Sequence, residues 1–366
     1  MSKSQYGIYA ECVSHENEVY YNLPFLFVLD GSLDADRLCR AIETMLKSHP
    51  TFFTRIGVND DGEPFQFIDM EEVEGFNGLN VQEFKGTKAE DLEAEKAKFI
   101  EPFQLYGGRL FHVRVLRDTE HIYWFFDMHH IIGDGSTLQI VLHDVEAAYN
   151  GSILAPEEMT MQEIALAESE MRKTSDFEKG KQWYAQNFDC SDTFTPLIPD
   201  LEGTERFEAN KECLLGIDKE RVETFCKVNG IKRTTLFTAA YAYLLAKYNN
   251  EQESLFATVY NGRTDQRFLH SVGMTVKTLP VYAKFTEETT VLDFLKANQE
   301  QMTGCREHDL YSYTDVMADL NLQTNSMFAW RGEMLGDTQL MGKPMETVHL
   351  RNYTLGVSLC LTAGEE

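Results

Sequence analysis

Between residues 120 and 151 the pattern of apolar and polar positions changes its period. Ile122 to Phe126 is a short run of aromatic and β-branched residues, which is typical of a buried strand. Ser136 and Gln139 then have the spacing of a helix capping box, and Asn150-Gly151 would end that helix. Between these ends, apolar residues recur as on a buried helix face, at Leu138, Leu142, Val145 and Tyr149. The pattern therefore predicts a strand, a tight loop and a helix that begins at Ser136.

The predicted loop holds two adjacent histidines, His129 and His130, followed by Asp134 and Gly135. Successive strand residues point to opposite faces of a sheet. If strand pairing persists to the end of the strand, only one of the two histidines can face a given cleft. The other histidine must then have a structural role. Asp127 shares the parity of His129 along the strand, and we expect it to be structural as well.

Strands and helices also alternate along the rest of the first half of the chain. The helix predicted from Leu33 to Ser48 has the clearest apolar stripe, formed by Leu38, Ala41, Ile42, Met45 and Leu46. The other expected elements are a strand at Leu23–Leu29, a hairpin of Phe52–Val58 and Pro64–Ile68, a helix at Glu90–Phe99, a strand at Arg109–Leu116, and polar helices at Met159–Lys173 and Ser175–Phe188. We place a lobe boundary between the two polar helices, which gives an N-terminal lobe of residues 1–174 and a C-terminal lobe of residues 175–366.

The second half of the chain repeats the mixed order of strands and helices predicted for the first half. Its expected elements are a strand at Glu212–Gly216, a helix at Thr234–Tyr248, a strand at Leu255–Tyr260, a turn at Gly262-Arg263, a strand at Thr275–Ala283 and a helix from Val291 to about Cys305. The segment Ile217–Val222 also resembles Leu33–Leu38, which lies at the start of the first predicted helix. Mixed strands and helices, twice over, predict two similar α/β lobes, and a ligand cleft would most naturally lie between them.

The last predicted strand, Tyr353–Leu361, is followed by only five residues, from Thr362 to Glu366. A domain seldom stops straight after a strand whose neighbour has not yet appeared. We therefore expect the chain to be a fragment of a longer polypeptide, with a C-terminal lobe that is truncated at its end.

Composition narrows the class of partner. The chain has 33 basic and 59 acidic residues, a formal net charge of -26, which argues against nucleic acid or an anionic membrane surface as the main partner. Its seven cysteines are odd in number and form no C-x-x-C pair, so we interpret them as reduced thiols. The sequence has neither an apolar leader nor a run of about 18 apolar residues. These features predict a soluble cytoplasmic protein.

Three interpretations of the loop compete. Both histidines could be satisfied core residues, with Asp134 and Gly135 serving the turn into the helix. A metal site of His129, His130 and Asp134 has poor geometry, because neighbouring strand histidines diverge and no further ligand motif accompanies them. Acyl transfer suits the loop best, since a histidine can handle the proton of a nucleophile while N–H groups at a helix N-terminus stabilise an oxyanion. We expect no bound metal.

The stretch from His129 to Gly135 matches the HHxxxDG signature of the condensation domains of nonribosomal peptide synthetases, which are relatives of chloramphenicol acetyltransferase. The resemblance extends along nearly the whole chain, through Ser4–Tyr9, Tyr21–Pro24, the region of His49, Gln182–Tyr184 and Val272–Pro280. This ordered set of motifs is specific. The chain departs from the family pattern at Lys277 in place of asparagine, at Ser136 in place of an aromatic residue and at Phe52-Phe53 in place of Leu-Arg. These departures bear on substrate subtype more than on reaction class.

The resemblance implies two chloramphenicol-acetyltransferase-like lobes in a V-shaped pseudo-dimer. It also implies amide bond formation between a donor acyl or peptidyl thioester and an acceptor aminoacyl thioester, each carried on the 4'-phosphopantetheine of a carrier protein. The expected partners are an upstream and a downstream carrier domain and an adjacent adenylation domain. No cofactor would be bound to the chain itself.

The resemblance also implies separate roles for the loop residues. His130 corresponds to the second histidine, which acts either as a base or mainly as an orienter. His129 would hydrogen-bond within the lobe, and Gly135 would let the backbone approach the substrate arm and could supply an oxyanion donor through its N–H. Asp134 resembles the family aspartate that pairs with an arginine of the second lobe. Arg263 is the matching candidate, and we expect a bidentate pair.

Alternative functions stay open at this point. The chain resembles a condensation domain most, but an epimerisation domain or a free-standing acyltransferase that uses coenzyme A would belong to the same superfamily. A catalytically idle module that only docks a carrier protein is a further alternative from a different class. The intact loop motif disfavours the idle module, and a turnover assay would distinguish all of them.

Overall fold

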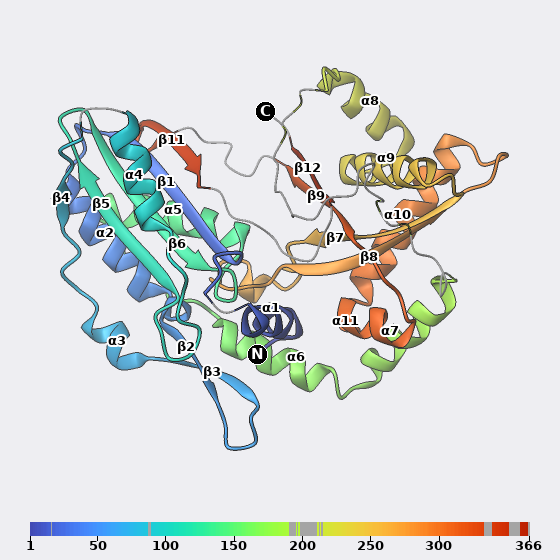
Figure 1. Ribbon diagram of the computed structural model, residues 1–366, viewed down its shortest axis with the longest axis horizontal. Coiled ribbons are helices and arrows are strands. Elements are labelled where there is room, and N and C mark those ends of the chain that lie inside the picture. The colour runs from blue at the N-terminus through green and yellow to red at the C-terminus, as the bar shows by residue number, and fades with distance from the viewer. Residues whose placement is uncertain are drawn as a thin grey trace, which may run out of the picture. The chain divides into compact units, whose positions relative to one another are not determined.

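The computed structural model describes residues 1–15, 17–86, 89–189, 195, 197, 211, 213, 215–332, 339–350 and 359–364. The chain forms two compact units (Figure 1). Unit 1 comprises residues 1–169, 261–276 and 334–354, and unit 2 comprises residues 170–260, 277–333 and 355–366. The division thus differs from a single boundary at residue 174, because two later segments of the chain pack with the first unit.

Unit 1 is built on a six-stranded sheet with the order β10-β11-β1-β6-β5-β4. These strands span Gln339–Leu340 (β10), Lys343–His349 (β11), Asn22–Asp30 (β1), His121–His129 (β6), Phe111–Arg117 (β5) and Val81–Glu83 (β4). Neighbouring strands are antiparallel except β4 and β5, which are parallel. The central pair β1 and β6 stays in register to the end of β6, where Asn22 faces His129. The histidine loop therefore leaves the sheet at a fixed point.

Both faces of β6 are covered, which explains its unbroken apolar run. Trp124, Phe126 and Met128 belong to the main core, which also takes in the buried stripe of α2 (Ala35–Ser48) and α5 (Gly135–Tyr149). Tyr123 and Phe125 point to the opposite face and pack with Phe99 of α4 (Ala89–Phe99). A strand that is buried on both sides loses the alternation of a half-exposed strand. The predicted strand, loop and helix are confirmed in outline.

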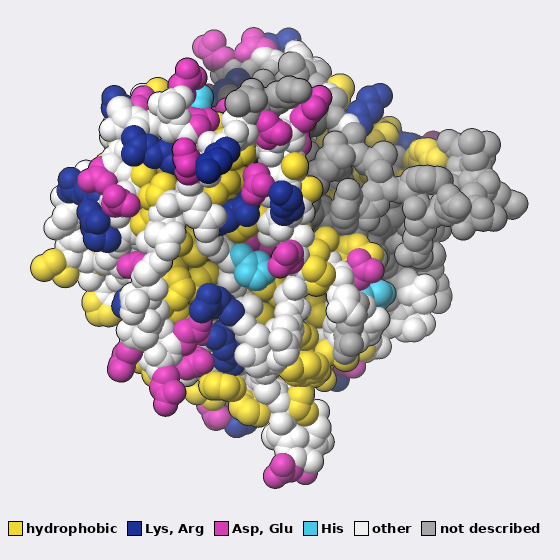
Figure 2. Space-filling view, turned by 60° about the vertical axis from the view of Figure 1, so that its left-hand side comes forward, with side chains coloured by type: hydrophobic (Ala, Val, Ile, Leu, Met, Phe, Trp, Pro, Cys, Tyr) yellow, Lys and Arg dark blue, Asp and Glu magenta, His cyan; other side chains and the backbone are white. Residues whose placement is uncertain are grey.

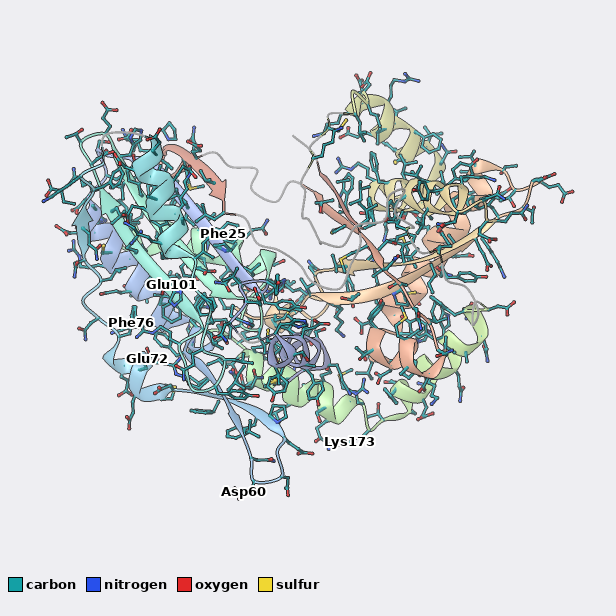
Figure 3. All side chains as sticks on the ribbon, in the orientation of Figure 1. Phe25, Asp60, Glu72, Phe76, Glu101 and Lys173 are labelled. Atoms are coloured by element: carbon teal, nitrogen blue, oxygen red, sulfur yellow. The ribbon has the colours of Figure 1, made fainter. Side chains whose placement is uncertain are left out.

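The remaining elements of unit 1 surround this sheet. They are α1 (Lys3–Ser14), the 3₁₀ turn η1 (Pro50–Phe53), β2 (Thr54–Val58), β3 (Pro64–Ile68), α3 (Met70–Gly75), α6 (Met161–Met171) and the 3₁₀ turn η2 (Gln266–Phe268). The hairpin was predicted to begin at Phe52, which is wrong, because Pro50 starts a 3₁₀ turn that directs Phe52 and Phe53 into the core. Asp60 lies at the tip of the β2–β3 hairpin (Figure 3).

Unit 2 has a four-stranded sheet with the order β12-β9-β7-β8. The strands are β7 (Glu253–Tyr260), β8 (Lys277–Lys284), β9 (Ser326–Gly332) and β12 (Leu359–Gly364), and the helices are α7 (Ser175–Asn187), α8 (Lys219–Asn229), α9 (Arg233–Tyr248), α10 (Val291–Glu307) and α11 (Tyr313–Asp319). The similar segments Leu33–Leu38 and Ile217–Val222 both lie at helix starts. The Asp34 side chain caps α2 and the Asp218 side chain caps α8. Residues 212 and 214 of one expected strand and residues 353–358 of another lie outside the described residues.

Charge is mixed on the face of the molecule that Figure 2 shows. Although the chain carries a net charge of -26, Lys and Arg side chains lie there among acidic and apolar ones. Within the described residues, none of the helices has the length and apolarity needed to cross a membrane.

Candidate active site

Helix α5 begins one residue earlier than the sequence pattern predicted. Asp134, not Ser136, is the N-cap, with extended backbone angles of φ -138° and ψ -175°. Its Oδ1 accepts a hydrogen bond from the Thr137 N–H at 3.0 Å, and the Thr137 hydroxyl lies 3.2 Å from the Asp134 N–H. The expected start at Ser136 is therefore wrong. A carboxylate at the N-cap also interacts favourably with the positive end of the helix dipole, which Ser136 cannot match.

The other side of Asp134 holds the segment that leads into β8. Its Oδ2 accepts hydrogen bonds from the Thr275 N–H and hydroxyl, both at 2.9 Å, and from the Val276 N–H at 3.2 Å. Arg263 Nη2 donates to Asp134 Oδ1 at 3.1 Å, and both side chains are buried. The ion pair is monodentate, whereas a bidentate pair was expected, because the carboxylate oxygens are shared with the helix cap and with Thr275.

The two terminal nitrogens of Arg263 also donate to backbone carbonyl groups. Nη1 donates to the Ser271 carbonyl at 2.7 Å and to the Phe268 carbonyl at 3.0 Å. The segment 261–276 belongs to unit 1, and Val272 and Met274 join the main core. Arg263 was expected on the opposite lobe from Asp134, which is wrong at the level of the compact units. The chain returns to unit 1 between β7 and β8, so the pair fixes this return.

His129 is buried and its two ring nitrogens have partners. Nδ1 accepts a hydrogen bond from the Ile131 N–H at 3.1 Å, so the neutral ring carries its proton on Nε2, which lies 3.5 Å from Cys12 Sγ. Burial and the neighbouring His130 lower the pKa of His129 to about 3. The ring is therefore neutral at physiological pH and is engaged within unit 1.

His130 differs from His129 in both position and contacts. It follows the last residue of β6, is half-buried, and donates its backbone N–H to the Tyr21 carbonyl at 2.7 Å. Its ring lies 6.5 Å from the Tyr21 ring, measured between centroids. Nδ1 of His130 is buried, yet no group in the described part of the chain forms a hydrogen bond with it. Among the described residues, Nδ1 of His130 is thus a ring nitrogen of the loop without a protein partner.

The two glycines of the loop have different positions. Gly135 is the first residue of α5, where N–H groups have no carbonyl partner within the helix. Gly133 lies where a Cβ atom would stand 2.6 Å from Met128 Sδ, so a side chain there would require the buried Met128 side chain to shift. The sequence motif indicated Gly135, whereas the packing role of Gly133 follows only from the structure.

Asp127 lies on the same face of β6 as His129. It is fully buried, and Asn22 Nδ2 donates to its Oδ2 at 2.7 Å. Burial raises the pKa of Asp127 to about 7, although the hydrogen bond from Asn22 opposes this shift. The carboxyl group faces the interior of unit 1 beside Asn22, which accords with the structural assignment made from strand parity.

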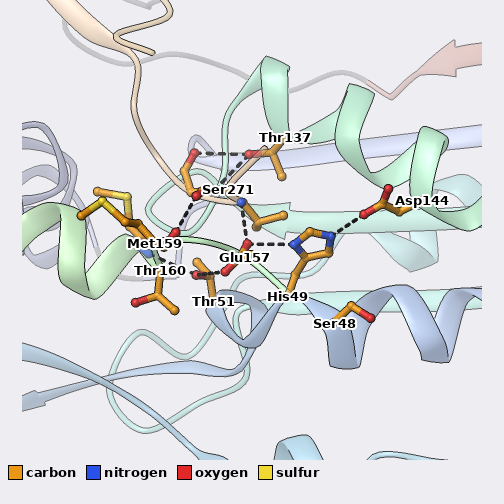
Figure 4. A network of polar contacts seen from close by, with 12 residues as sticks. Ser48, His49, Thr51, Thr137, Asp144, Glu157, Met159, Thr160 and Ser271 are labelled. Atoms are coloured by element: carbon orange, nitrogen blue, oxygen red, sulfur yellow. Dashed lines mark hydrogen bonds and ion pairs between the residues drawn. The ribbon is translucent and has the colours of Figure 1, made fainter. Parts of the chain in front are cut away.

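A further buried network joins four segments of unit 1 around His49 (Figure 4). His49 Nε2 lies 2.7 Å from Asp144 Oδ2 on α5, and Nδ1 lies 2.8 Å from Glu157 Oε1. Glu157 Oε1 also accepts the Val272 N–H at 2.7 Å. Burial favours the neutral ring, but the two carboxylates outweigh it and raise the pKa of His49 to about 9. His49 is therefore protonated at neutral pH. The sequence indicated His49 as part of a motif but not its partners.

Metal binding has no support from side-chain clustering. Within the described ranges, no group of three or more His, Cys, Asp and Glu side chains could hold a metal ion. His129 and Asp134 are committed to the hydrogen bonds given above.

The two-unit mixed α/β fold and the histidine loop ahead of a capped helix are the features that place this chain in a protein family. A model of the condensation domain matches residues 1–331. The chain belongs to the condensation-domain family. Similar proteins include bacitracin synthase 1 of Bacillus licheniformis, 27% identical over 321 residues that cover 84% of this chain and 6% of that protein. Tyrocidine synthase 3 of Brevibacillus parabrevis is 28% identical over 312 residues, 83% of this chain and 5% of that protein.

Solved structures confirm the fold class. The condensation domain of monacolin K polyketide synthase MokA superposes with a TM-score of 0.80 at 16% identity, covering 100% of this chain and 88% of that one. The first condensation domain of the CDA synthetase gives a TM-score of 0.77 at 15% identity, covering 100% and 89%. The chain spans less than a tenth of the length of the two synthases above. Condensation domains as a family catalyse amide-bond formation on substrates bound to carrier proteins.

Proposed function

We propose that this chain forms an amide bond between two substrates that are delivered by carrier proteins. The donor is an acyl or peptidyl group held as a thioester on 4'-phosphopantetheine, and the acceptor is an aminoacyl group held in the same way. An upstream and a downstream carrier domain and an adjacent adenylation domain are the proposed partners. The reaction class accords with the family to which the chain belongs.

The observation that carries this proposal is the contrast within the loop. The His129 ring and both carboxylate oxygens of Asp134 are occupied by protein groups, whereas Nδ1 of His130 has no partner in the described part of the chain. A general base needs a ring that is held in place and is not already used by the protein, and the half-buried His130 ring meets this condition where the buried His129 ring does not. We therefore assign the chemical role to His130 and supporting roles to His129, Asp134 and Arg263.

The proposed step balances without a bound cofactor. The acceptor α-amino group, whose pKa is ordinarily about 8, attacks the thioester carbonyl in its neutral form, so a C–N bond forms and an oxyanion develops. His130 takes a proton from the nitrogen, and backbone N–H groups at the start of α5, including that of Gly135, stabilise the oxyanion. The C–S bond then breaks, and the leaving thiolate takes up the proton. The products are an amide and a free phosphopantetheine thiol.

A reconstituted assay tests the proposal. The purified protein in its natural full length is mixed with an acyl-loaded donor carrier and an aminoacyl-loaded acceptor carrier, with a metal chelator present and without nucleotide. We expect the acyl group to appear on the acceptor amine, as measured by mass spectrometry of the acceptor carrier. The thioester already holds the energy that amide formation needs.

Two results would contradict the proposal. Inversion of the α-carbon of one carrier-bound aminoacyl group, without amide formation, would favour an epimerisation domain. Transfer from acyl-coenzyme A at the same rate as from the donor carrier would favour a free-standing acyltransferase. A mixture that lacks the acceptor carrier is the matched control for hydrolysis of the donor thioester.

A further inference from the structure

Helix α1 brings one of its faces against the histidine loop. Gln5, Ile8 and Cys12 lie at i, i+3 and i+7, which places them on the same side of the helix. Ile8 packs in the main core, and Cys12 Sγ lies 3.5 Å from His129 Nε2. Gln5 is only 1% exposed, and its Nε2 donates to the Ile131 carbonyl at 2.8 Å. A segment more than a hundred residues away in sequence thus contacts the residue that follows His130.

The backbone on both sides of the His130 side chain is fixed by hydrogen bonds. Ahead of it, the His130 N–H donates to the Tyr21 carbonyl at 2.7 Å. After it, the Ile131 N–H donates to His129 Nδ1 at 3.1 Å, and the Ile131 carbonyl accepts from Gln5. Ile131 is 1% exposed, so its carbonyl would lose water and gain nothing if Gln5 could not donate.

The orientation of the Gln5 amide is set by its other neighbours. Its Oε1 accepts the Ser2 N–H at 3.0 Å, which only an oxygen can do. The Gln66 amide on β3 faces it reciprocally, with Gln5 Nε2 3.0 Å from Gln66 Oε1 and Gln66 Nε2 3.2 Å from Gln5 Oε1. With the oxygen held towards Ser2, the amide nitrogen must face the Ile131 carbonyl. Gln5 therefore presents a pre-oriented donor to the loop.

We propose that Gln5 is a positioning residue for the His130 imidazole, acting through the Ile131 carbonyl. This inference rests on the proposed function, in which His130 contacts the reacting amine. A displacement of about 1 Å in a catalytic group can lower a rate by about 10²-fold. The hydrogen bond from Gln5 to the Ile131 carbonyl, which holds the peptide next to His130, therefore affects turnover. The first segment of the chain, which contributes no reacting group, sets the geometry of the loop.

The test compares Gln5→Met with a matched double variant, Ser2→Ala/Gln66→Met. Gln5→Met keeps the length of the side chain and removes its amide. The double variant removes the Ser2 hydroxyl cap and the Gln66 amide. It leaves the Ser2 backbone N–H that holds the Gln5 oxygen and therefore leaves the Gln5 donor on Ile131. In the carrier assay we expect Gln5→Met to lower kcat about 10-fold with KM for the acceptor carrier unchanged, and the double variant to stay within twofold of wild type.

A readout that does not depend on turnover keeps this inference separate from the proposed function. With ¹⁵N-labelled histidine, the His130 ring resonances should shift in Gln5→Met and stay in place in the double variant. If the wild-type protein made no amide, the proposed function would fail, but the NMR comparison would still test whether Gln5 positions the His130 ring. Equal effects of both variants on kcat, or His130 resonances that Gln5→Met leaves unmoved, would overturn the positioning role.

Discussion

The two ends of the histidine loop are held very differently. At Asp134 both carboxylate oxygens are occupied, one by the α5 cap and Arg263, the other by Thr275 and Val276. At His130, four residues earlier, the backbone is fixed but a ring nitrogen has no partner in the described part of the chain. The difference indicates a division of labour. The Asp134 end anchors the loop to unit 1, and the His130 end leaves a side chain available for chemistry.

The largest effect should come from breaking the anchored end. Removal of one partner of a buried ion pair leaves the other charge uncompensated, at a cost of about 3–5 kcal/mol. We therefore expect Asp134→Asn and Arg263→Met each to lower the free energy of unfolding by that amount, measured by urea denaturation. Asparagine retains the capping ability of aspartate, but its amide nitrogen cannot accept the hydrogen bonds from Thr275 and Val276, so the loss reports on the charge and on these bonds together. The double variant should lose less than the sum of the two.

An exposed pair supplies the control for that cycle. Lys179 and Asp176 on α7 form an ion pair with side chains 66% and 61% exposed, and such pairs contribute about 0.2–1 kcal/mol. Asp176→Asn should therefore change the free energy of unfolding by less than about 1 kcal/mol. Additive losses at Asp134 and Arg263 would mean that the two residues do not stabilise one another.

The His49 network should give a smaller effect, visible in the pH dependence of stability. The pKa of His49 is raised to about 9 in the folded protein from an ordinary value of 6.5. Protonated His49 therefore contributes stability that is fully present below about pH 6.5 and is lost as pH rises through 9. A shift of this size corresponds to about 3 kcal/mol. Urea denaturation at pH 6.5 and pH 9.5 should show this loss in the wild type.

His49→Gln provides the comparison for the pH series. This variant cannot carry the charge between Asp144 and Glu157, so it should be less stable than wild type at pH 6.5. The difference in the free energy of unfolding between the two proteins should be smaller at pH 9.5 than at pH 6.5. If the free energy of unfolding changed with pH identically in both proteins, His49 would not be the group that titrates.

Local patterns in the sequence predicted the elements whose signals are also local. The apolar stripe of α2 and the unbroken run of β6 are recognisable because burial on one face or both leaves a direct trace in residue order. Helix α1 leaves a weak trace, since only Gln5 and Ile8 of its twelve residues are buried. Strand β11 pairs with β1 more than three hundred residues earlier in the chain, and periodicity does not name a strand's partner.

The same distinction explains which parts of the site were predictable. The motif and strand parity identified His129, His130 and Asp134 and separated the two histidines. Asp134 also contacts Arg263 and Thr275, which lie 129 and 141 residues away and which no local pattern identifies as its partners. Asp144 and Glu157, the partners of His49, lie 95 and 108 residues from it. The V-shaped arrangement of the two lobes stays a prediction.

The most direct test of the division of labour is the single-turnover rate of amide formation in His130→Ala. The donor and acceptor carriers are loaded in advance, and His121→Ala, at the other end of β6, serves as the control. We predict that His130→Ala lowers the rate by about 10²-fold or more with the free energy of unfolding nearly unchanged, whereas His121→Ala leaves both unaltered. A loss of only a few-fold in His130→Ala would contradict proton transfer by His130 and leave that residue a role in positioning.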